Sequence, residues 1–220
     1  MLNQTKFWFL KDFDLMKKMG KMNLMKMCEL LEMKHFRKGE EIEFKYNDSN
    51  VVFFLKVGTI KIVSKSTNHT IHLVKKGNIF GELSLFSDQA PDEKAITLED
   101  VTLCYIQADQ MRMLLDQHLS LKNGILKLNG IRIRKLKTRL EDLLYKDSYT
   151  RIKEYIINYI KEFGEIIDTN YEAKNLISHS DIAHLTNTSR QTVSNVMSKL
   201  RKEGVIQYDS KKIELLMTKN

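Results

Sequence analysis

The pattern of apolar and polar residues changes several times along the chain, and each change predicts a different kind of element. In the first 35 residues, apolar side chains recur at helical spacing with lysines between them, at Phe13, Met16, Met19, Leu24, Met27, Leu30 and Leu31. That spacing predicts helix over residues 1–35. The methionines indicate a packing face that tolerates an imperfect fit.

Short strands are predicted from His35 onward, because the apolar residues now alternate with polar ones or form brief runs. Gly39, Gly58 and Gly77 fall where turns are needed. The predicted strands cover residues 37–40, 41–44, 51–63, 70–74, 95–98 and 101–106. Regular short strands with glycine turns are typical of a sandwich or roll rather than of a parallel sheet.

Residues 109–145 have the periodicity of a long helix. Its apolar stripe consists of Leu114, Leu121, Ile125, Leu128, Leu136, Leu140 and Leu143. One helix of this length would extend about 55 Å, more than a small domain can cover, so it would need a partner along its length. Two shorter helices that meet at Asn129 and Gly130 remain an alternative, since a glycine in a helix interior costs about 1 kcal/mol.

A further helix is predicted over residues 148–163, with Asp147 as its N-cap and as a hinge. Its apolar face is formed by Ile152, Tyr155, Ile156, Tyr159 and Ile160. Gly164 ends the pattern. We interpret residues 165–175 as a polar connector and place the start of a second domain near residue 148.

Residues 178–204 predict two helices joined by a tight turn. Ser178, with Asp181 three residues later, is close to a capping box and opens the first helix. Asn187 tolerates the left-handed backbone that a turn at residues 186–188 uses. The small side chain of Ala183 allows the two helices to approach each other closely.

The second of these helices is predicted to begin with Thr188 as N-cap and Gln191 at the third position, and to end at Gly204. Its outer face is polar and carries side chains that can read base edges or contact phosphates. These side chains are Ser189, Arg190, Gln191, Ser194, Asn195 and Lys199. A solvated amphipathic helix pair is the alternative, but the cap, turn and small-residue positions agree together on a helix-turn-helix.

The segments 205–208 and 213–216 predict a β-hairpin with a polar turn, which would form a wing beside the helix pair. At this point the residues 188–195 and 199–206 resemble the recognition helix and wing of the Crp/Fnr family of bacterial transcription regulators. The strand order over about residues 10–107 likewise resembles the β-roll of cyclic-nucleotide-binding domains. In this family the long helix pairs with that of a second copy, which implies a dimer interface at Leu114, Leu121, Ile125, Leu128 and Leu136.

The resemblance implies an α+β chain with an N-terminal antiparallel β-roll, a long dimerisation helix and a C-terminal winged helix-turn-helix. The corresponding segments are residues 1–107 for the effector-sensing roll with its N-terminal helices, 108–147 for the dimerisation helix and hinge, and 148–220 for the DNA-binding domain. The polar connector and the caps described above fit this division.

Residues 77–86 are similar to the phosphate-binding cassette of the family, with Gly81, Glu82, Leu83 and Ser84 as the tentative ligand-binding residues. Nucleotide-binding members follow the cassette with an arginine and a hydroxyl residue before an alanine. Aligning that alanine with Ala95 places Glu93 and Lys94 at those positions. An anion in place of a cation at about 4 Å from a phosphate turns an attraction of a few kcal/mol into a repulsion.

We therefore expect no ordinary binding of cyclic AMP. Two readings remain open: the cassette is kept only as part of the fold, or it binds another small molecule. The sequence predicts no cofactor, and a small-molecule effector is unidentified.

Composition narrows the function further. The chain has 220 residues, 42% of them hydrophobic, and a net charge of +8 that suits a polyanionic partner. No apolar run approaches the ~18 residues of a membrane span, and no signal-peptide core is present, so we expect a cytoplasmic protein that has no membrane contact.

The sequence offers little for metal or catalytic chemistry. Cys28 and Cys104 are isolated and form neither a disulfide framework nor a cysteine-ligated cluster, and the histidines lack metal spacing. No nucleophile has a placed base, and no Walker-type loop is present. We expect no metal site and no catalytic residue, and therefore no enzyme.

The sequence leads to a homodimer that binds double-stranded DNA at an inverted repeat with half-sites about 34 Å apart, with RNA polymerase as a further partner. Arg190 would contact guanine or phosphate, Gln191 would pair with adenine, and Asn195 would do the same or bind through water. Ser178, Thr188 and Ser189 would donate to phosphates. Sequence-independent attraction would come from Lys199, Arg201 and Lys202.

A sensor of cyclic nucleotides or other small ligands, whose winged helix contacts protein, is the alternative function. The effector, the operator sequence and the choice between activation and repression stay open at this level.

Overall fold

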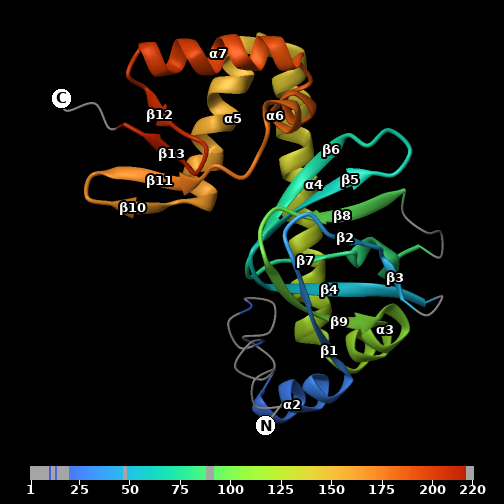
Figure 1. Ribbon diagram of the computed structural model, residues 1–220. Coiled ribbons are helices and arrows are strands. Elements are labelled where there is room, and N and C mark those ends of the chain that lie inside the picture. The colour runs from blue at the N-terminus through green and yellow to red at the C-terminus, as the bar shows by residue number, and fades with distance from the viewer. Residues whose placement is uncertain (1–9, 11–12, 14–19, 47–48, 88–91, 217–220) are drawn as a thin grey trace. The chain divides into compact units, whose positions relative to one another are not determined.

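The computed structural model describes residues 10, 13, 20–46, 49–87 and 92–216. The chain forms two compact units that divide between Arg134 and Lys135. The first unit contains strands β1 to β9 and the second contains strands β10 to β13 with two helices of the helix-turn-helix (Figure 1).

Two antiparallel sheets form the first unit. One has the order β1-β9-β4-β3, with β7 also paired to β4, and the other has the order β2-β8-β5-β6. The strands are β1 (Glu32–Phe36), β2 (Glu41–Ile42), β3 (Lys45–Tyr46), β4 (Ser49–Val57), β5 (Thr59–Ser64), β6 (Thr70–Lys75), β7 (Ile79–Phe80), β8 (Glu93–Thr97) and β9 (Val101–Gln107). This is the antiparallel roll that the glycine-punctuated strand pattern predicts, and that prediction is confirmed.

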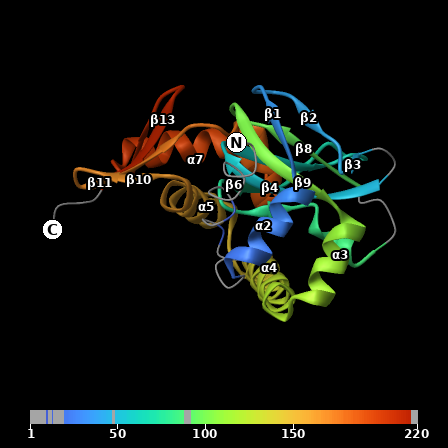
Figure 2. The same ribbon diagram turned by 90° about the horizontal axis from the view of Figure 1, so that it is seen from below.

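The sheet of β1, β9 and β4 buries both of its faces. One face meets the second sheet in a core that includes Phe53, Phe80 and Leu103. The rings of Phe53 and Phe80 stack with their centroids 4.6 Å apart. The other face, with Phe54 and Ile106, packs against helices, and Figure 2 shows α2 (Lys21–Leu30) and α3 (Ala108–Gln117) on that side of the strands. The alternation of side chains along each strand therefore supplies two cores at once.

The N-terminal segment is only partly helical where it is described. Helix α2 ends at Leu30, and residues 32–36 form β1, whose register pairs Glu32 with Tyr105 and Phe36 with Val101. The prediction of helix up to residue 35 is therefore wrong at its end, because the open edge of β9 satisfies the backbone of these residues. Met16 and Met19 lie outside the described residues.

The predicted helix over residues 109–145 is divided into α3 and α4 (Leu119–Tyr145). The break is at His118, whose backbone is extended (φ −129°, ψ 92°). The single-helix prediction is wrong, and so is the alternative break at Asn129 and Gly130, which lie inside α4. The bend lets Leu114 of α3 and Leu121 of α4 enter the same core, a gain in buried area that periodicity alone cannot reveal.

The second unit combines the end of α4 and the helices α5 to α7 with a four-stranded sheet of order β10-β11-β13-β12. Its elements are α5 (Ser148–Phe163), β10 (Glu165–Ile167), β11 (Asn170–Lys174), α6 (His179–Thr186), α7 (Arg190–Lys202), β12 (Ile206–Tyr208) and β13 (Lys212–Leu215). The predicted helix over residues 148–163 and the predicted wing hairpin are confirmed. The N-cap is also confirmed, since the carboxylate of Asp147 accepts the backbone N–H of Thr150 at 2.7 Å.

Residues 165–175, which we interpret from sequence as a connector, instead form the β10–β11 hairpin, and that prediction is wrong. Asp168 takes the left-handed backbone of its turn (φ 53°). Strand β11 pairs with β13, with Ala173 opposite Ile213. β10 is an edge strand in which all three residues, Ile166 and Ile167 included, are exposed, so it has no alternation of buried and exposed positions to reveal it.

Gly164 is required by a close approach between helix and hairpin. A Cβ atom at this position would lie 2.4 Å from the carbonyl oxygens of both Ile160 and Glu172. Its N–H donates to the carbonyl of Ile160 and ends α5. Glycine thus both stops the helix and lets β11 pass beside its end.

Candidate nucleic-acid interface

The first helix of the helix-turn-helix begins at the predicted capping box. The backbone N–H of Asp181 donates to Ser178 Oγ at 3.1 Å, and Ser178 N–H donates to Asp181 Oδ2 at 3.0 Å. The helix ends at Asn187, which has the left-handed backbone (φ 50°, ψ 58°) that the sequence predicts. Both ends of α6 are thereby fixed by its own side chains and turn.

Helix α7 starts one residue later than predicted. Its N-cap is Ser189, whose Oγ accepts the backbone N–H of Thr192 at 3.0 Å, so the pairing of Thr188 with Gln191 is wrong. Thr188 instead belongs to the turn, where its N–H donates to the carbonyl of Ala183. Gly204 follows the helix with φ +69°, as its predicted role requires.

One face of α7 packs into the unit through Val193, Val196, Met197 and Leu200. The opposite face is exposed and holds Arg190, Gln191, Asn195, Ser198, Lys199, Arg201 and Lys202. Ser194 is half-buried at its edge. Sequence reasoning missed Ser198, although its helical spacing from Gln191 and Asn195 places it on the same face.

The two amides on this face are joined to each other. Gln191 Nε2 donates to Asn195 Oδ1 at 3.1 Å, one helical turn apart. This bond uses neither the carbonyl oxygen of Gln191 nor the amino group of Asn195. The pair therefore keeps one acceptor and one donor, the two functions that the N6 and N7 groups of an adenine edge require.

The basic residues toward the end of α7 are oriented by aromatic rings. Lys199 Nζ lies 4.5 Å from the centroid of the Tyr149 ring, and the guanidinium of Arg201 lies 4.2 Å from that of Tyr208 on the wing. Cation–π contacts of this kind hold a positive charge without neutralising it. Lys199 also reaches Glu203 at 3.8 Å.

The hydroxyl groups expected to contact phosphates already have partners in the chain. Ser178 Oγ donates to Asp181 Oδ2 at 2.6 Å, Thr188 Oγ1 lies 3.1 Å from Thr186 Oγ1, and Ser189 Oγ lies 2.8 Å from Thr192 Oγ1. Their first role is to shape the two caps and the turn. Any contact with a ligand would have to share or exchange these bonds.

His179 lies at the start of α6, near Arg190. Partial burial lowers the pKa of its imidazole, and the positive charge of Arg190 lowers it further. His179 is therefore harder to protonate than an ordinary histidine, and Arg190 is a fixed positive charge at this end of α7.

In the first unit, the cassette-like segment forms β7, Gly81 and the short 3-10 helix η1 (Glu82–Leu85). Gly81 is left-handed (φ +74°), and a Cβ atom there would lie 2.7 Å from the carbonyl oxygen of Val51. Glu82 is 1% exposed and forms an ion pair with Arg132 of α4. Ser84 is also buried, whereas Leu83 is 54% exposed.

Glu93 and Lys94 point to opposite faces of β8, as alternation along a strand requires. Ala95 is fully buried in the roll core, which places Glu93 on the inner face with it. Burial raises the pKa of the Glu93 carboxyl, with a smaller contribution from Asp92. Lys94 pairs with Glu41 at 2.6 Å on the other face, so it does not compensate for the anion inside.

The apolar stripe assigned to a dimer interface is not a single surface. Leu114, Leu121 and Ile125 are buried in the core of their own chain, and Leu128 packs against it. Only Leu136 is exposed, at 64%. The interface prediction needs correction at these four buried or packed positions, because the roll itself covers the stripe that periodicity reveals.

A second apolar stripe on α4 remains uncovered. Four of its members, Leu119, Leu126, Ile133 and Leu140, are 57–70% exposed and follow one another at heptad intervals. Leu136 and Leu143 lie three residues after the last two. This spacing brings all six residues to one side of the helix.

The described residues include no helix that is long and apolar enough to cross a membrane. Within the same residues, histidine, cysteine and carboxylate side chains form no group of three that could hold a metal ion.

Comparison with known proteins identifies both units. The model of the cyclic nucleotide-binding domain matches residues 33–118, and that of the Crp-like helix-turn-helix domain matches residues 151–219. The chain belongs to the Crp/Fnr family of transcription regulators. Crp/Fnr membership makes it a DNA-binding regulator with a cyclic-nucleotide-binding-like roll, as the sequence predicts.

Relatives in this family cover most of the chain. The global nitrogen regulator of Synechocystis sp. is 26% identical over 81% of both chains, and the CRP-like cAMP-activated global transcriptional regulator of Mycobacterium tuberculosis is 20% identical over 81% of both. The structure of FixK2 from Bradyrhizobium japonicum superposes with a TM-score of 0.72 at 14% identity, covering 85% of this chain and 93% of that one.

Proposed function

We propose that this Crp/Fnr regulator acts as a homodimer that reads an inverted-repeat operator through α7, by binding rather than catalysis. The observation that carries the proposal is the composition of the exposed face of α7. It holds amides at its centre and four basic residues around them, and it has no acidic residue before Glu203. A helix with that face fits a major groove, where amides read bases and cations contact phosphates.

The uncovered heptad stripe on α4 supports the dimer. Leucine and isoleucine at heptad positions on an exposed helix face form the seam of a coiled coil. We therefore assign the interface to Leu119, Leu126, Ile133, Leu136, Leu140 and Leu143, and retain only Leu136 from the sequence-based set. Two copies related by a twofold axis would present two α7 helices to half-sites about one turn of DNA apart.

Within each half-site, the joined amides of Gln191 and Asn195 are proposed to read one adenine edge, and Arg190 a neighbouring guanine or phosphate. Lys199, Arg201 and Lys202 supply attraction that does not depend on sequence. Ser178, Thr188 and Ser189 are proposed to contact the DNA backbone by sharing their internal bonds, and Ser194 and Ser198 are proposed to contact it beside them.

The roll is proposed not to respond to cyclic AMP in the usual way. Glu82, which would bind the ribose in nucleotide-binding members, is paired with Arg132, and Glu93 lies inside the roll at the place of the phosphate-pairing arginine. Gly81, Leu83, Ser84 and Lys94 complete the tentative ligand segment, although Lys94 faces outward. A different small molecule as effector stays compatible with this arrangement.

RNA polymerase is proposed as a second partner, because a regulator acts on transcription through the enzyme that performs it. The alternative, in which the winged helix contacts protein and not DNA, is disfavoured by the cationic face of α7. That alternative function predicts that the protein binds no DNA duplex at any salt concentration.

Selection of bound sequences from random duplexes by the purified full-length protein tests the proposal. The expected result is one inverted repeat with half-site centres about 10 base pairs apart. The Arg190→Ala variant should select a repeat with weaker preference at one position of each half-site. Enrichment of a single unrepeated site, or of no sequence, would contradict the proposal.

A further inference from the structure

A single arginine at the start of α5 joins three elements of the DNA-binding unit. Arg151 Nη1 donates to the carbonyl of Lys146 at 2.6 Å, Nε donates to that of Thr186 at 3.1 Å, and Nη2 donates to that of Asn187 at 3.3 Å. Lys146 follows the last residue of α4, whereas Thr186 and Asn187 end α6. One guanidinium thus bonds the C-terminal ends of two helices.

These carbonyls are groups that a helix leaves without an internal partner. The last turn of a helix has free carbonyl oxygens and carries partial negative charge, which a cation complements. The N–H groups of the planar Arg151 guanidinium point in several fixed directions, so this side chain donates hydrogen bonds to the carbonyls at both helix ends at once. A lysine ammonium keeps the charge, but it cannot reproduce three divergent bonds in one plane.

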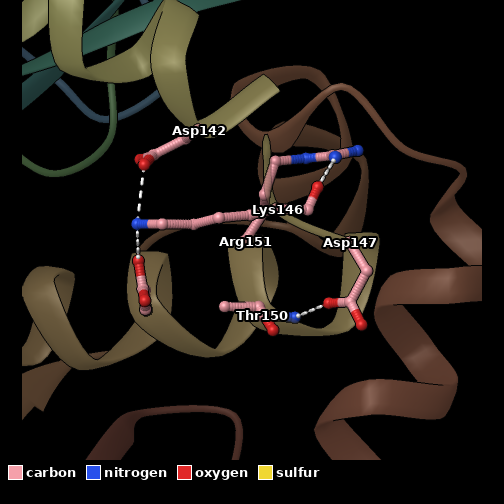
Figure 3. A network of polar contacts seen from close by, with 6 residues as sticks. Asp142, Lys146, Asp147, Thr150 and Arg151 are labelled. Atoms are coloured by element: carbon pink, nitrogen blue, oxygen red, sulfur yellow. Dashed lines mark hydrogen bonds and ion pairs between the residues drawn. The ribbon is translucent and has the colours of Figure 1, made fainter. Parts of the chain in front are cut away.

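Further contacts hold the end of α4 to the same unit. Lys146 Nζ lies 2.6 Å from Asp142 and 2.5 Å from Glu154 of α5, and Figure 3 shows this pair of bonds beside the cap of Asp147 and the bond from Arg151 to the carbonyl of Lys146. Arg139 donates to the carbonyl of His184 at 3.3 Å. The two bonding carboxylates raise the pKa of Lys146, so this cation is kept at neutral pH.

The junction at Asp147 is therefore bonded on both sides and does not resemble a free hinge. The boundary between the compact units lies on the N-terminal side of this junction, within α4, between Arg134 and Lys135. The last part of α4 belongs to the unit that contains α7.

We infer that Arg151 is a positioning residue for DNA recognition, which fixes the angle between the end of α4 and the recognition helix. The turn at Asn187 leads within two residues to Ser189, the N-cap of α7, so a bond that holds Asn187 also sets where α7 begins. The inference rests on the proposed homodimer and its inverted repeat. In that dimer, the angle determines the separation of the two recognition helices and hence the half-site spacing that the protein accepts.

The test compares wild type, Arg151→Lys and the control Arg134→Lys, which makes the same chemical change at an exposed position of α4. Each full-length protein is titrated with the selected operator and with versions that have one base pair added or removed at its centre. One base pair rotates one half-site against the other by about 35°. Wild type and the control should lose about tenfold or more in affinity on this change.

Arg151→Lys should lose less than about threefold on the same change, while its base preference within a half-site stays as in wild type. Because the charge is kept, its salt dependence should also match wild type. Amides of residues 186–193 should exchange faster with solvent in this variant, and amides of β4 and β9 should not.

Equal spacing discrimination in wild type and Arg151→Lys would overturn the inference and leave the proposed function intact. Wild type that binds no duplex, or binds without spacing preference, would overturn both. If Arg151→Lys does not fold, Lys146→Gln removes the ion pairs to Asp142 and Glu154 at the same junction. It should broaden spacing tolerance in the same direction, and unchanged tolerance would overturn the inference.

Discussion

The carboxylate of Glu82 is paired with the guanidinium of Arg132, which reaches it from α4. Arg132 also donates to the carbonyl of Ile79 at 2.7 Å, so one arginine bonds both sides of the Gly81 turn. Burial lowers the pKa of Arg132 to about 10, which still leaves it protonated at neutral pH. The glutamate that the sequence assigns to ligand binding is thus engaged by the protein's own helix.

Replacing Arg132 with methionine should destabilise the first unit. Glu82 is 1% exposed and would lose its cation, and removing one partner of a buried ion pair typically costs about 3–5 kcal/mol. The measurement is the free energy of unfolding by urea, followed by circular dichroism and by hydrogen exchange at β4 and β9. Adding Glu82→Gln to Arg132→Met should recover most of the loss, and an undiminished loss in the double variant would mean that the charge is not its cause.

Cyclic AMP should give no heat of binding and no change in DNA affinity at millimolar concentration. The inner-face carboxylate of Glu93 would repel the phosphate by a few kcal/mol at about 4 Å with an effective dielectric near 20. Isothermal titration calorimetry makes the measurement, with Glu93→Arg as the variant that reverses the charge and weakens the repulsion. A micromolar dissociation constant for wild type would refute this expectation.

Substitution of Ile133 with lysine should convert the dimer to monomer without unfolding the roll. Ile133 is 66% exposed, so the change costs the monomer little while placing charge in the proposed seam. The matched change Leu121→Ala should do the reverse, costing about 2–5 kcal/mol of stability and leaving the dimer in place. Sedimentation equilibrium across protein concentrations distinguishes them, and a dimeric Ile133→Lys protein would move the interface elsewhere.

Lys202→Gln and Asn195→Ala should weaken DNA binding in different ways. Lys202 is proposed to contact phosphate, so its loss should weaken all sequences alike and lower the slope of log affinity against log salt by about one. Asn195→Ala should cost about 1–3 kcal/mol on the selected operator and much less on sequences changed at the adenine position. Binding titrations at several salt concentrations measure both, and a change of slope with Asn195→Ala would argue against base contact.

Acid should destabilise the second unit partly through His179. Its folded pKa is lowered by burial and by Arg190 from the ordinary 6.5, so the unfolded chain takes up the proton more readily. Stability from this residue is complete above pH 6.5 and falls as the pH drops from there through the lowered folded pKa. Unfolding of wild type and His179→Gln at pH 7.5, 6.5 and 5.5 should show a smaller loss in the variant, and parallel losses would assign the effect to other groups.

Local sequence patterns were sufficient to predict the features that depend on residues close together in the sequence. The capping box of Ser178 and Asp181, the left-handed Asn187 and the helix stop at Gly204 depend on residues within a few positions of one another. Their side chains therefore satisfy backbone groups in any context that permits a helix. The polar face of α7 follows from the same helical repeat.

Contacts between segments far apart in the sequence decided the features that the sequence-based predictions missed. The break at His118, the pairing of β11 with the wing strand β13 and the burial of Leu121 and Ile125 all depend on segments that are distant in the sequence. A helical stripe is apolar in the same way whether it packs on its own roll or on a second copy, so spacing cannot choose between them. The bonds from Arg132 to Glu82 and from Arg151 to Asn187 likewise join residues far apart in the chain.

By itself, the sequence determined the type and order of most elements and the chemistry of the DNA-reading face, because these arise from contacts within a turn or two of helix or strand. The tertiary structure alone decided which α4 stripe is left exposed, that Glu82 is already paired and that Arg151 bonds two helix ends. Each of these requires distant segments to be brought within hydrogen-bonding or packing distance, and only the folded chain does that.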